Sequence, residues 1–208
     1  MEQVLDLYQE SYDPRFPLVC MDEKSKQLLG DMRVPLPLRP GAVVRADYEY
    51  ERNGTCNLFI AFAPLLGWRH IEVTDRRTAV DWAHFMKQLA DVHYPDAERI
   101  RVVMDNLNTH TIGSFYEAFE ATEARRLALR FEFHYTPKHG SWLNMAEIEL
   151  SALERMCLDQ RLATQAAVKN EAAAWEDERN DTSVTVDWRF TTPDARIKLK
   201  SLYPSISV

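Results

Sequence analysis

The sequence is poor in cysteine, which excludes two common ways of stabilising a fold. Its 208 residues include three cysteines, Cys20, Cys56 and Cys157, which are widely spaced and odd in number. Neither a CxxC pair nor a cluster of cysteine and histidine is present, so the sequence indicates neither a zinc site nor a disulfide framework. We therefore expect reduced thiols that are buried in the core.

Long apolar segments are missing as well. The first residues contain no basic region followed by an apolar run, which a secretory signal would require. The longest apolar stretch, around residues 58–66, is far too short for a membrane-spanning helix and contains Pro64. The sequence therefore predicts a cytoplasmic protein with no membrane partner.

Positive charge is in deficit. The chain carries 25 lysines and arginines against 32 aspartates and glutamates, a formal net charge of -7. Proteins that hold DNA through its phosphates usually present a basic face. Net charge alone therefore argues against a nucleic-acid binder, and an acidic active site accounts for only part of the deficit.

The chain does contain enough apolar residues for a complete core. Hydrophobic residues make up 46% of the sequence, and the length suits one domain. We predict a single domain over residues 1–208, with a lead-in over 1–17 and a tail over 181–208. Residues 35–40, which are rich in proline, predict an extended connector that cannot be helical.

Short apolar runs predict five strands, at residues 18–21, 57–63, 68–74, 100–104 and 131–135. The second and third form a hairpin that turns through Pro64 and Gly67. The fourth is continuously apolar, as in the centre of a sheet that is covered on both faces. The fifth alternates aromatic with polar residues, which favours a half-buried strand nearer an edge.

Apolar residues at helical spacing predict helices over residues 78–90, 114–129 (with an interruption), 144–158 and 164–179. Thr78 and Asp81 have the spacing of a capping box at the start of the first of these. Strands and helices in this order predict an α/β domain with a mixed central sheet flanked by helices. The same order matches the ribonuclease H-like fold.

Three carboxylates stand where such a fold could bring them together. Asp22 ends the first predicted strand, and Asp105 follows the buried strand 100–104. If those strands are neighbours, both acids project from one edge of the sheet, where catalytic groups of open α/β sheets gather. Glu147, near the start of the helix over 144–158, completes a candidate triad.

The chemistry of such a trio follows from its charge. Carboxylates held together repel one another unless cations lie between them, and Mg²⁺ prefers oxygen ligands. Two ions about 4 Å apart can activate an attacking hydroxyl and stabilise the leaving oxygen of a phosphodiester. The pattern therefore predicts in-line phosphoryl transfer, and not acyl transfer or redox chemistry.

Spacing alone leaves a structural role open for each acid. Asp22 is equally typical of a turn or a helix cap. The polar cluster after Asp105 also suits a solvated loop, and within it His110 either orients a water or phosphate or is a structural histidine. Asn144 and Glu147 have the spacing of a capping box. Glu149 is a rival to Glu147, because the two lie about 200° apart around a helix and cannot both face the same metals.

Three blocks of sequence resemble a known family. They are VCMDEKS (19–25), VVMDNLNTH (102–110) and HYTPKHGSWLNMAE (134–147). Together they resemble the catalytic blocks of DDE transposases, in particular bacterial insertion-sequence transposases of the mariner-like superfamily. The segment DYEYERNGT (47–55) is similar to that group too. The resemblance runs from about residue 4 to about residue 204.

The resemblance implies a ribonuclease H-like fold in which Asp22, Asp105 and Glu147 are the catalytic acids and bind Mg²⁺ or Mn²⁺. It assigns Glu147, and not Glu149, to the final acidic block. It also implies DNA cleavage and strand transfer in cut-and-paste transposition, typically at TA. Transposon ends and target DNA would then be the partners, and a homodimer is expected by resemblance alone.

The sequence departs from this family in two respects. The interval between Asp105 and Glu147 is somewhat longer than usual, and the usual N-terminal helix-turn-helix region is absent from this chain. That region would have supplied much of the positive charge. Two alternatives therefore stand beside an active transposase domain: an inactive or regulatory remnant, and a ribonuclease H-like nuclease or resolvase.

Four further residues are candidates for DNA contact. Lys138, His139 and Trp142 precede the helix that carries Glu147, where they could contact phosphate and stack on a displaced base. The alternative is a solvated lysine and a tryptophan that covers the core. Arg52 could also touch DNA, although an exposed arginine in a hairpin is the commoner case. The basic residues of the tail indicate a solvated helix face.

Overall fold

A mixed five-stranded sheet of order β3-β2-β1-β4-β5 forms the centre of the molecule. The computed structural model describes residues 1–32, 49–138 and 140–203, so the proline-rich residues 35–40 lie outside the described part. The strands are β1 (Leu18–Asp31), β2 (Tyr50–Ala63), β3 (Trp68–Thr74), β4 (Ile100–Met104) and β5 (Phe131–Tyr135). β1, β2 and β3 pair antiparallel, and β4 and β5 join in parallel. This is the predicted ribonuclease H-like sheet.

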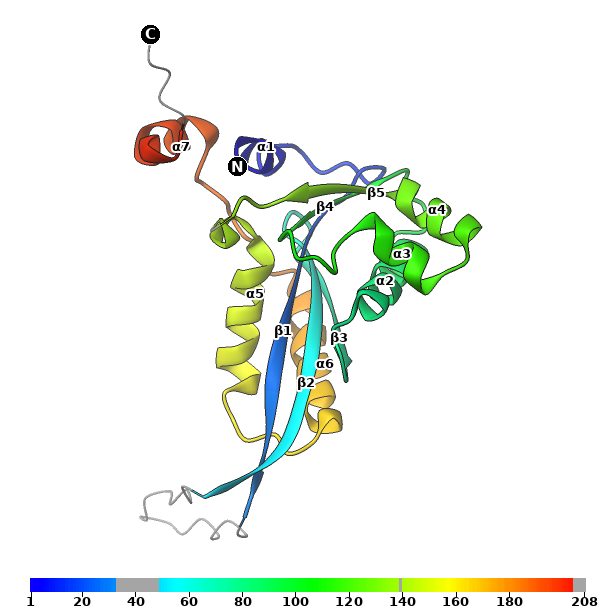
Figure 1. The fold of residues 1–208 in the computed structure, drawn as a ribbon. Coiled ribbons are helices and arrows are strands. Elements are labelled where there is room, and N and C mark those ends of the chain that lie inside the picture. The colour runs from blue at the N-terminus through cyan, green and yellow to red at the C-terminus, as the bar shows by residue number, and fades with distance from the viewer. Residues whose placement is uncertain (33–48, 139, 204–208) are drawn as a thin grey trace.

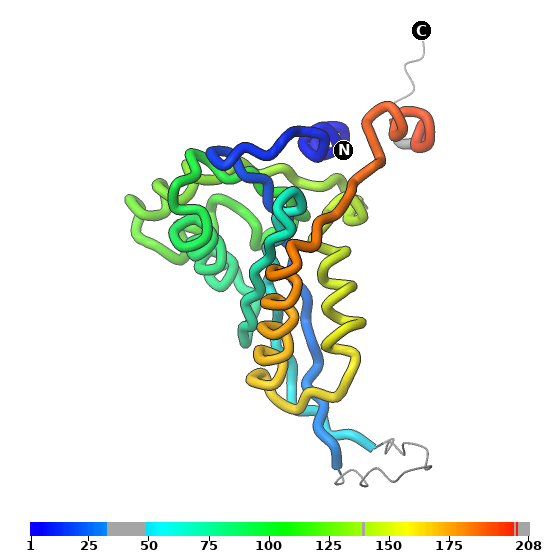
Figure 2. Tube along the Cα trace, turned by 180° about the vertical axis from the view of Figure 1, so that it is seen from behind, coloured from blue at the N-terminus to red at the C-terminus, as the bar shows by residue number. Residues whose placement is uncertain are grey.

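Helices cover both faces of this sheet (Figures 1 and 2). One face carries α1 (Glu2–Leu7), α5 (Met145–Leu153) and α6 (Gln165–Asp181). The other face carries α2 (Ala79–Gln88), α3 (Ile112–Ala118) and α4 (Ala121–Arg130). A further helix, α7 (Thr192–Lys198), lies beside α1. π-helical turns extend α2 over Leu89–His93 and α5 over Glu154–Leu158, and short 3-10 turns cover Ser141–Leu143 and Lys200–Leu202.

Alternation along the strands divides the core in two. Leu18 and Cys20 pack toward the side of α1, α5 and α6, whereas Val19 and Met21 pack toward α2, α3 and α4. On β4, Val103 faces the first of these sides, and its two neighbours face the second. The same two-residue period fixes the direction of the polar residues that follow.

The first two strands are longer than the sequence indicates. β1 does not end at Met21 but runs to Asp31, and β2 begins at Tyr50 and not at Asn57. Their pairing continues from Cys20–Phe62 to Asp31–Tyr50 as a long ribbon that α5 and α6 flank and whose far end extends beyond both helices (Figure 1). Most of the added residues are polar and those of β2 over residues 50–55 are exposed, but Leu28 and Cys56 are buried in the core that α5 and α6 share. Pairing between the two strands and these two buried side chains together extend the strands beyond the apolar runs.

Other predicted elements agree closely with the structure. β3 and β4 have the predicted bounds, and Thr78 and Asp81 form a capping box at α2. The helix expected over 114–129 is interrupted, because α3 ends at Ala118 and α4 begins at Ala121. β5 is an edge strand. Of the cysteines, Cys20 and Cys56 are buried as expected, whereas Cys157 is only partly buried.

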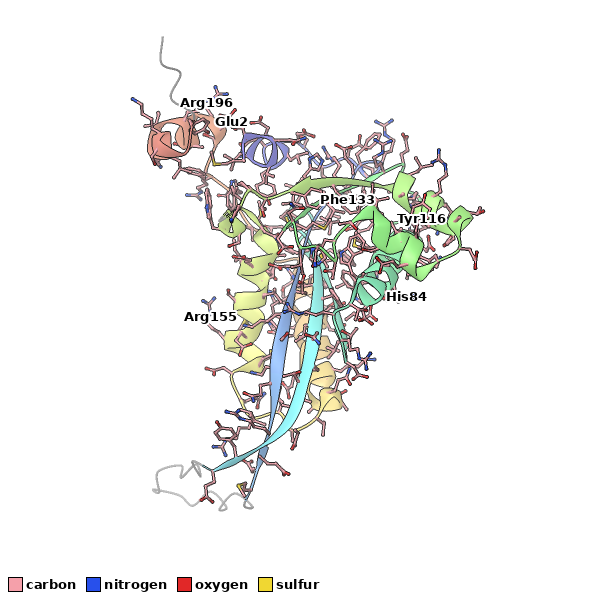
Figure 3. The ribbon with its side chains drawn as sticks, viewed as in Figure 1. Glu2, His84, Tyr116, Phe133, Arg155 and Arg196 are labelled. Atoms are coloured by element: carbon pink, nitrogen blue, oxygen red, sulfur yellow. The ribbon has the colours of Figure 1, made fainter. Side chains whose placement is uncertain are left out.

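The two terminal segments contain helices. The lead-in over residues 1–17 includes α1, whose Val4, Leu5 and Leu7 are buried, and the tail after residue 181 includes α7. Glu2 and Arg196 join these helices through two hydrogen bonds of 2.7 and 2.8 Å (Figure 3). None of the helices in the described part of the chain combines the length and apolar character needed to cross a membrane.

Candidate active site

Asp22 and Asp105 lie at corresponding positions on neighbouring strands. β1 and β4 pair in parallel from Leu18–Arg101 to Cys20–Val103. Two residues further along each strand come Asp22 and Asp105, so alternation turns both toward the face that Cys20 and Val103 occupy. That face is the one that α5 covers. The prediction that Asp22 ends its strand is wrong. Asp22 lies where the pairing of β1 with β4 has ended, while β1 stays paired with β2.

Asn144 attaches the start of α5 to this edge of the sheet. Its Nδ2 donates a hydrogen bond of 2.8 Å to the carbonyl oxygen of Met21, and its Oδ1 accepts one of 3.1 Å from the N–H of Ala146. One side chain therefore caps the helix and joins it to β1 next to Asp22. Glu147, in the first turn of α5, is carried to the same place.

The structure gives Glu147 no capping role. A capping box would need its carboxylate on the backbone N–H of Asn144, but that N–H already donates to the carbonyl oxygen of Ser141 at 2.7 Å. Glu149 has a different environment. It is 1% exposed and lies between Arg69, at 2.8 Å, and Arg179, at 2.9 Å. The two glutamates thus face different sides of α5, and Glu149 belongs to a buried ion-pair network.

The charges of the three predicted acids act on one another. Burial above all, together with the neighbouring charges of Glu23, Asp105 and Glu147, raises the pKa of Asp22 to about 7, against a hydrogen bond from the N–H of Glu23 that lowers it. A carboxylate in such a place is easier to ionise when a cation is bound. A bound divalent cation, which prefers oxygen ligands, would offset this cost.

Asp105 differs from Asp22 because it has a cationic partner. Its Oδ1 accepts hydrogen bonds from His110 Nδ1 at 2.8 Å and from the N–H of Leu107 at 3.2 Å. The bond from His110 is the largest influence that holds the pKa of Asp105 below its usual value. The side chain of Asp105 is nevertheless 43% exposed, so it remains open to a ligand.

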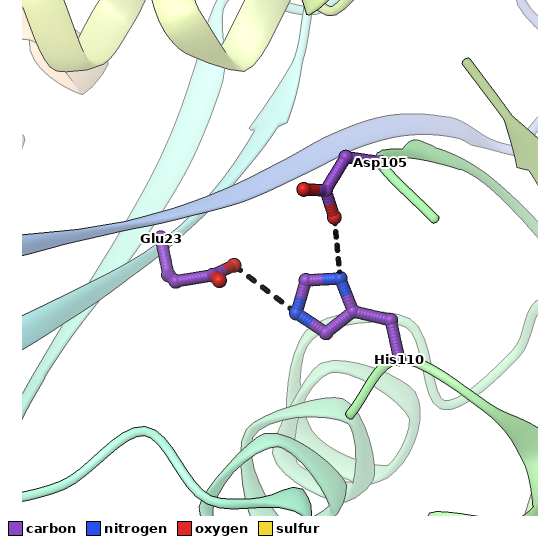
Figure 4. Close-up of side chains that lie close together, drawn as sticks. All are labelled: Glu23, Asp105 and His110. Carbon is purple, nitrogen blue, oxygen red and sulfur yellow. Dashed lines mark hydrogen bonds and ion pairs between the residues drawn. The ribbon is translucent and has the colours of Figure 1, made fainter. Parts of the chain in front are cut away.

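His110 also contacts Glu23, for which the sequence pattern predicted no role. His110 Nε2 lies 3.1 Å from Glu23 Oε2, so the imidazole stands between two carboxylates (Figure 4). Burial lowers the pKa of His110, but the two carboxylates outweigh it and raise that pKa to about 9. Among the residues that the structure describes, Glu23, Asp105 and His110 offer possible ligand atoms within 4.8 Å of one another.

The strand period separates Glu23 from the predicted triad. Asp22 faces α5, whereas Glu23, the next residue, faces α2 and the loop that carries His110. Only Asp105 belongs to both groups. The sequence contained one signal for this arrangement: two adjacent acids on a strand must point to opposite faces of the sheet.

The predicted DNA-contact residues are distributed unevenly. Lys138 lines an open depression of about 550 Å³ together with Asp105. Trp142 is 42% exposed and packs against Trp188 and Phe190, with ring centroids 6.4 and 5.6 Å away. Arg52 lies on the outer ribbon opposite Leu29, roughly 23 Å along the strand from Asp22, and packs on Tyr50. His139 lies outside the described residues.

Comparisons with known proteins agree with this fold. The family model described as DDE superfamily endonuclease matches residues 17–169. A search of curated protein sequences finds no match. Among solved structures, the chain is similar to a Mos1 mariner paired-end complex with Mn (TM-score 0.58, 18% identity, 88% of this chain and 54% of that chain).

Two further structures of the same transposase are similar. A Mos1 paired-end complex with the left transposon end gives a TM-score of 0.56 at 17% identity, over 88% of this chain and 56% of that chain. A pre-cleavage Mos1 transpososome gives 0.54 at 15% identity, over 90% and 61%. The chain thus spans little more than half the length of the transposases that it matches. Because the family model covers most of the sequence, with both aspartates and Glu147, the chain belongs to the DDE superfamily of endonucleases.

Proposed function

We propose that this chain is the catalytic domain of a transposase, in which Asp22, Asp105 and Glu147 bind divalent metal and direct the cleavage and joining of DNA. One observation carries the proposal. Asp22 and Asp105 lie at corresponding positions of two parallel strands, and Asn144 joins the start of α5, whose first turn holds Glu147, to β1 at Met21. Three mutually repelling carboxylates at the edge of a sheet favour bound cations.

Different residues would bind the metal ions and hold the binding residues in place. Two Mg²⁺ or Mn²⁺ ions, when bound, would polarise the phosphodiester and lower the pKa of the attacking water or 3′-hydroxyl. Asp22 and Asp105 would hold these ions from the sheet, and Glu147 would hold them from α5. Asn144 fixes the distance between the two elements. No side chain needs to form a covalent bond with DNA.

DNA is the proposed partner. Lys138 lies beside Asp105 in the open depression, where its ammonium group would neutralise a phosphate. Trp142 is 42% exposed, and the accessible part of its ring would stack on a base. Arg52 would meet DNA only if the duplex follows the β1–β2 ribbon, and His139 is a proposed contact from the sequence alone. Transposon ends, a target site, a homodimer and action in the cytoplasm are further parts of this proposal.

A plasmid-nicking assay tests the catalytic role. We expect the purified chain to nick supercoiled plasmid with Mn²⁺ or Mg²⁺, and we expect Asp105→Asn to abolish this activity. Asp177→Asn, at an exposed position of α6, is the matched control and should nick as the unsubstituted chain does. Equal activity of Asp105→Asn and the unsubstituted chain would contradict the triad.

Mn²⁺ binding and strand joining, measured beside nicking, separate the alternatives. A chain that binds Mn²⁺ through Asp105 but cleaves no DNA would favour a regulatory remnant. Cleavage without joining of a 3′-hydroxyl end to a second DNA would favour a nuclease or resolvase. Sequencing of joined products distinguishes strand transfer from simple hydrolysis.

A further inference from the structure

We propose that Glu23 and His110 form a buried support that positions Asp105 for metal binding. The inference deepens the proposed function and rests on it, because it assigns a purpose to these two residues only if Asp105 is a metal ligand. His110 and Glu23 are positioning residues here, since neither belongs to the predicted triad.

Each ring nitrogen of His110 contacts a carboxylate. His110 donates from Nδ1 to Asp105 Oδ1 at 2.8 Å, and its Nε2 lies 3.1 Å from Glu23 Oε2. The side chains of His110 and Glu23 are only 1% and 4% exposed, whereas that of Asp105 is 43% exposed. The chain of contacts therefore runs from the interior of the sheet to the accessible carboxylate.

The imidazole ring has little freedom to turn. It stacks on Trp82 with ring centroids 5.7 Å apart, and Trp82 is fully buried. The backbone of His110 is held as well, because its N–H donates to Leu107 at 2.9 Å and its carbonyl accepts from the Tyr135 hydroxyl at 2.9 Å. A ring fixed in this way also fixes the direction of the carboxylate that it contacts.

The hydrogen bond from His110 uses one carboxylate oxygen of Asp105 and leaves the other accessible to a ligand. Among the described residues, both hydrogen bonds that the side chain of Asp105 accepts fall on Oδ1. The other oxygen keeps its lone pairs for a cation. Histidine and carboxylate groups that orient a ligand from behind in this manner typically change metal affinity when they are removed.

Glu23 is placed to support His110 and not to join Asp22. Burying a carboxylate without a partner is costly, and His110 is the partner that the fold provides. Arg77 is more distant, at 3.7 Å from Glu23 Oε1, and its side chain is 52% exposed. Glu23 therefore depends on His110, and His110 links it to the candidate site.

Mn²⁺ binding to the whole chain, measured by isothermal titration calorimetry, tests the inference directly. We expect His110→Ala to weaken Mn²⁺ binding roughly 10- to 100-fold. His110→Asn can still direct an N–H toward Asp105, so it should recover part of that loss. Glu23→Gln keeps an oxygen for Nε2 and should weaken binding less than Glu23→Ala does.

A second buried histidine provides the matched control. His134, on β5, is 5% exposed and lies 3.0 Å from Glu132, but it contacts none of the three acids among the described residues. His134→Ala should leave Mn²⁺ affinity unchanged. Thermal unfolding of each variant shows that it is folded, and His110→Asn and Glu23→Gln keep the test valid if His110→Ala does not fold.

Each result has a definite meaning. Unchanged Mn²⁺ affinity in folded His110 and Glu23 variants, with binding lost in Asp105→Asn, would overturn the support while leaving the proposed function in place. Loss of binding in Glu23→Gln as complete as in Asp105→Asn would make Glu23 a ligand, which also overturns it. Normal binding and nicking by Asp105→Asn would instead remove the proposed function, and the support with it.

Discussion

Neighbouring residues on β1 meet different environments because successive side chains of a strand point to opposite faces. Asp22 is largely buried and lies near the charges of Glu23, Asp105 and Glu147, which together raise its pKa, whereas the Glu23 carboxylate lies 3.1 Å from His110. The first environment makes ionisation costly without a cation, and the second supplies a cation from the protein. Asp22 would thus need a bound cation to offset its charge, whereas Glu23 has His110 for this purpose.

The free-energy cost of ionising Asp22 in the folded state predicts how the stability of the metal-free protein depends on pH. Its pKa is about 7 when folded and about 4 when unfolded. The folded state therefore binds the proton more tightly, and the stability gained from this is lost as pH rises from about 4 to about 7. Asp22→Asn removes the loss, so we expect it to be more stable than the unsubstituted chain by roughly 1–3 kcal/mol at pH 8.

Urea unfolding in EDTA at several pH values measures this difference. The gap between Asp22→Asn and the unsubstituted chain should widen with pH across that window, while the same variant loses metal-dependent nicking. Asp177→Asn should show no widening. A gap that stays constant with pH would mean that burial and the neighbouring charges do not raise the pKa of Asp22 as the structure indicates.

The two glutamates of α5 predict opposite phenotypes. Glu149→Gln leaves buried Arg69 without its full counter-charge, so we expect a loss of about 3–5 kcal/mol in stability. Glu147→Gln changes a partly exposed side chain and should alter stability by less than about 0.5 kcal/mol, but it should abolish metal-dependent nicking. Urea unfolding and plasmid nicking of both variants check this. Retained nicking in a well-folded Glu147→Gln would exclude Glu147 from the triad.

At the scale of elements, the start of α5 connects helix stability to the candidate site. Asn144→Ala removes both the cap and the hydrogen bond to Met21, and we expect it to cost about 2–4 kcal/mol. Asn144→Asp keeps an oxygen for the N–H of Ala146 but cannot donate to Met21. Nicking should fall in both variants, because α5 and Glu147 are no longer fixed to β1.

The cap of α6 is the matched control for this prediction. Thr164 accepts a hydrogen bond from the N–H of Ala167 at 3.1 Å and lies at an exposed position. Thr164→Ala should lose about 1 kcal/mol of stability and retain nicking activity. If Asn144→Asp and Thr164→Ala had the same activity, attachment to Met21 would not matter to the site.

Elements with one strong local signal could be predicted from the sequence. The continuous apolar run of β4 and the capping box of α2 are examples, and both have the expected bounds. The outer half of β1 gave no such signal, because Lys24, Ser25 and Lys26 are consecutive polar residues with no apolar residue between them. Only its long partner strand makes it a strand, and a partner is not visible in local sequence.

The candidate site shows the same division. Asp105 could be identified because it follows a buried strand, and His110 because it lies in the polar cluster after Asp105. The contact of Glu23 with His110 could not be predicted, since it depends on which face of β1 meets the loop of His110. The spacing of Glu147 left a capping role open beside the triad, and the hydrogen bond from Asn144 to Ser141 excludes that role.

At the scale of the whole molecule, the terminal helices extend the core beyond the region that the family model matches. That region covers residues 17–169, yet α1 buries Leu5 against the same core as α5 and α6. Tyr8, just after α1, donates a hydrogen bond of 2.6 Å to the carbonyl oxygen of Leu143, next to Asn144. The first helix therefore supports the turn from which the Glu147 helix begins.

This packing predicts that α1 unfolds together with the sheet as part of one domain. Leu5→Ala should lower the free energy of unfolding by about 2–5 kcal/mol, because Leu5 is fully buried. Arg196→Ala removes an exposed ion pair with Glu2 and should have little effect. Urea unfolding followed by tryptophan fluorescence and far-UV circular dichroism should give one coincident transition for each protein. Two separate transitions, or a neutral Leu5→Ala, would show that α1 is an appendage, and the start of α5 would then have to be held by the sheet alone.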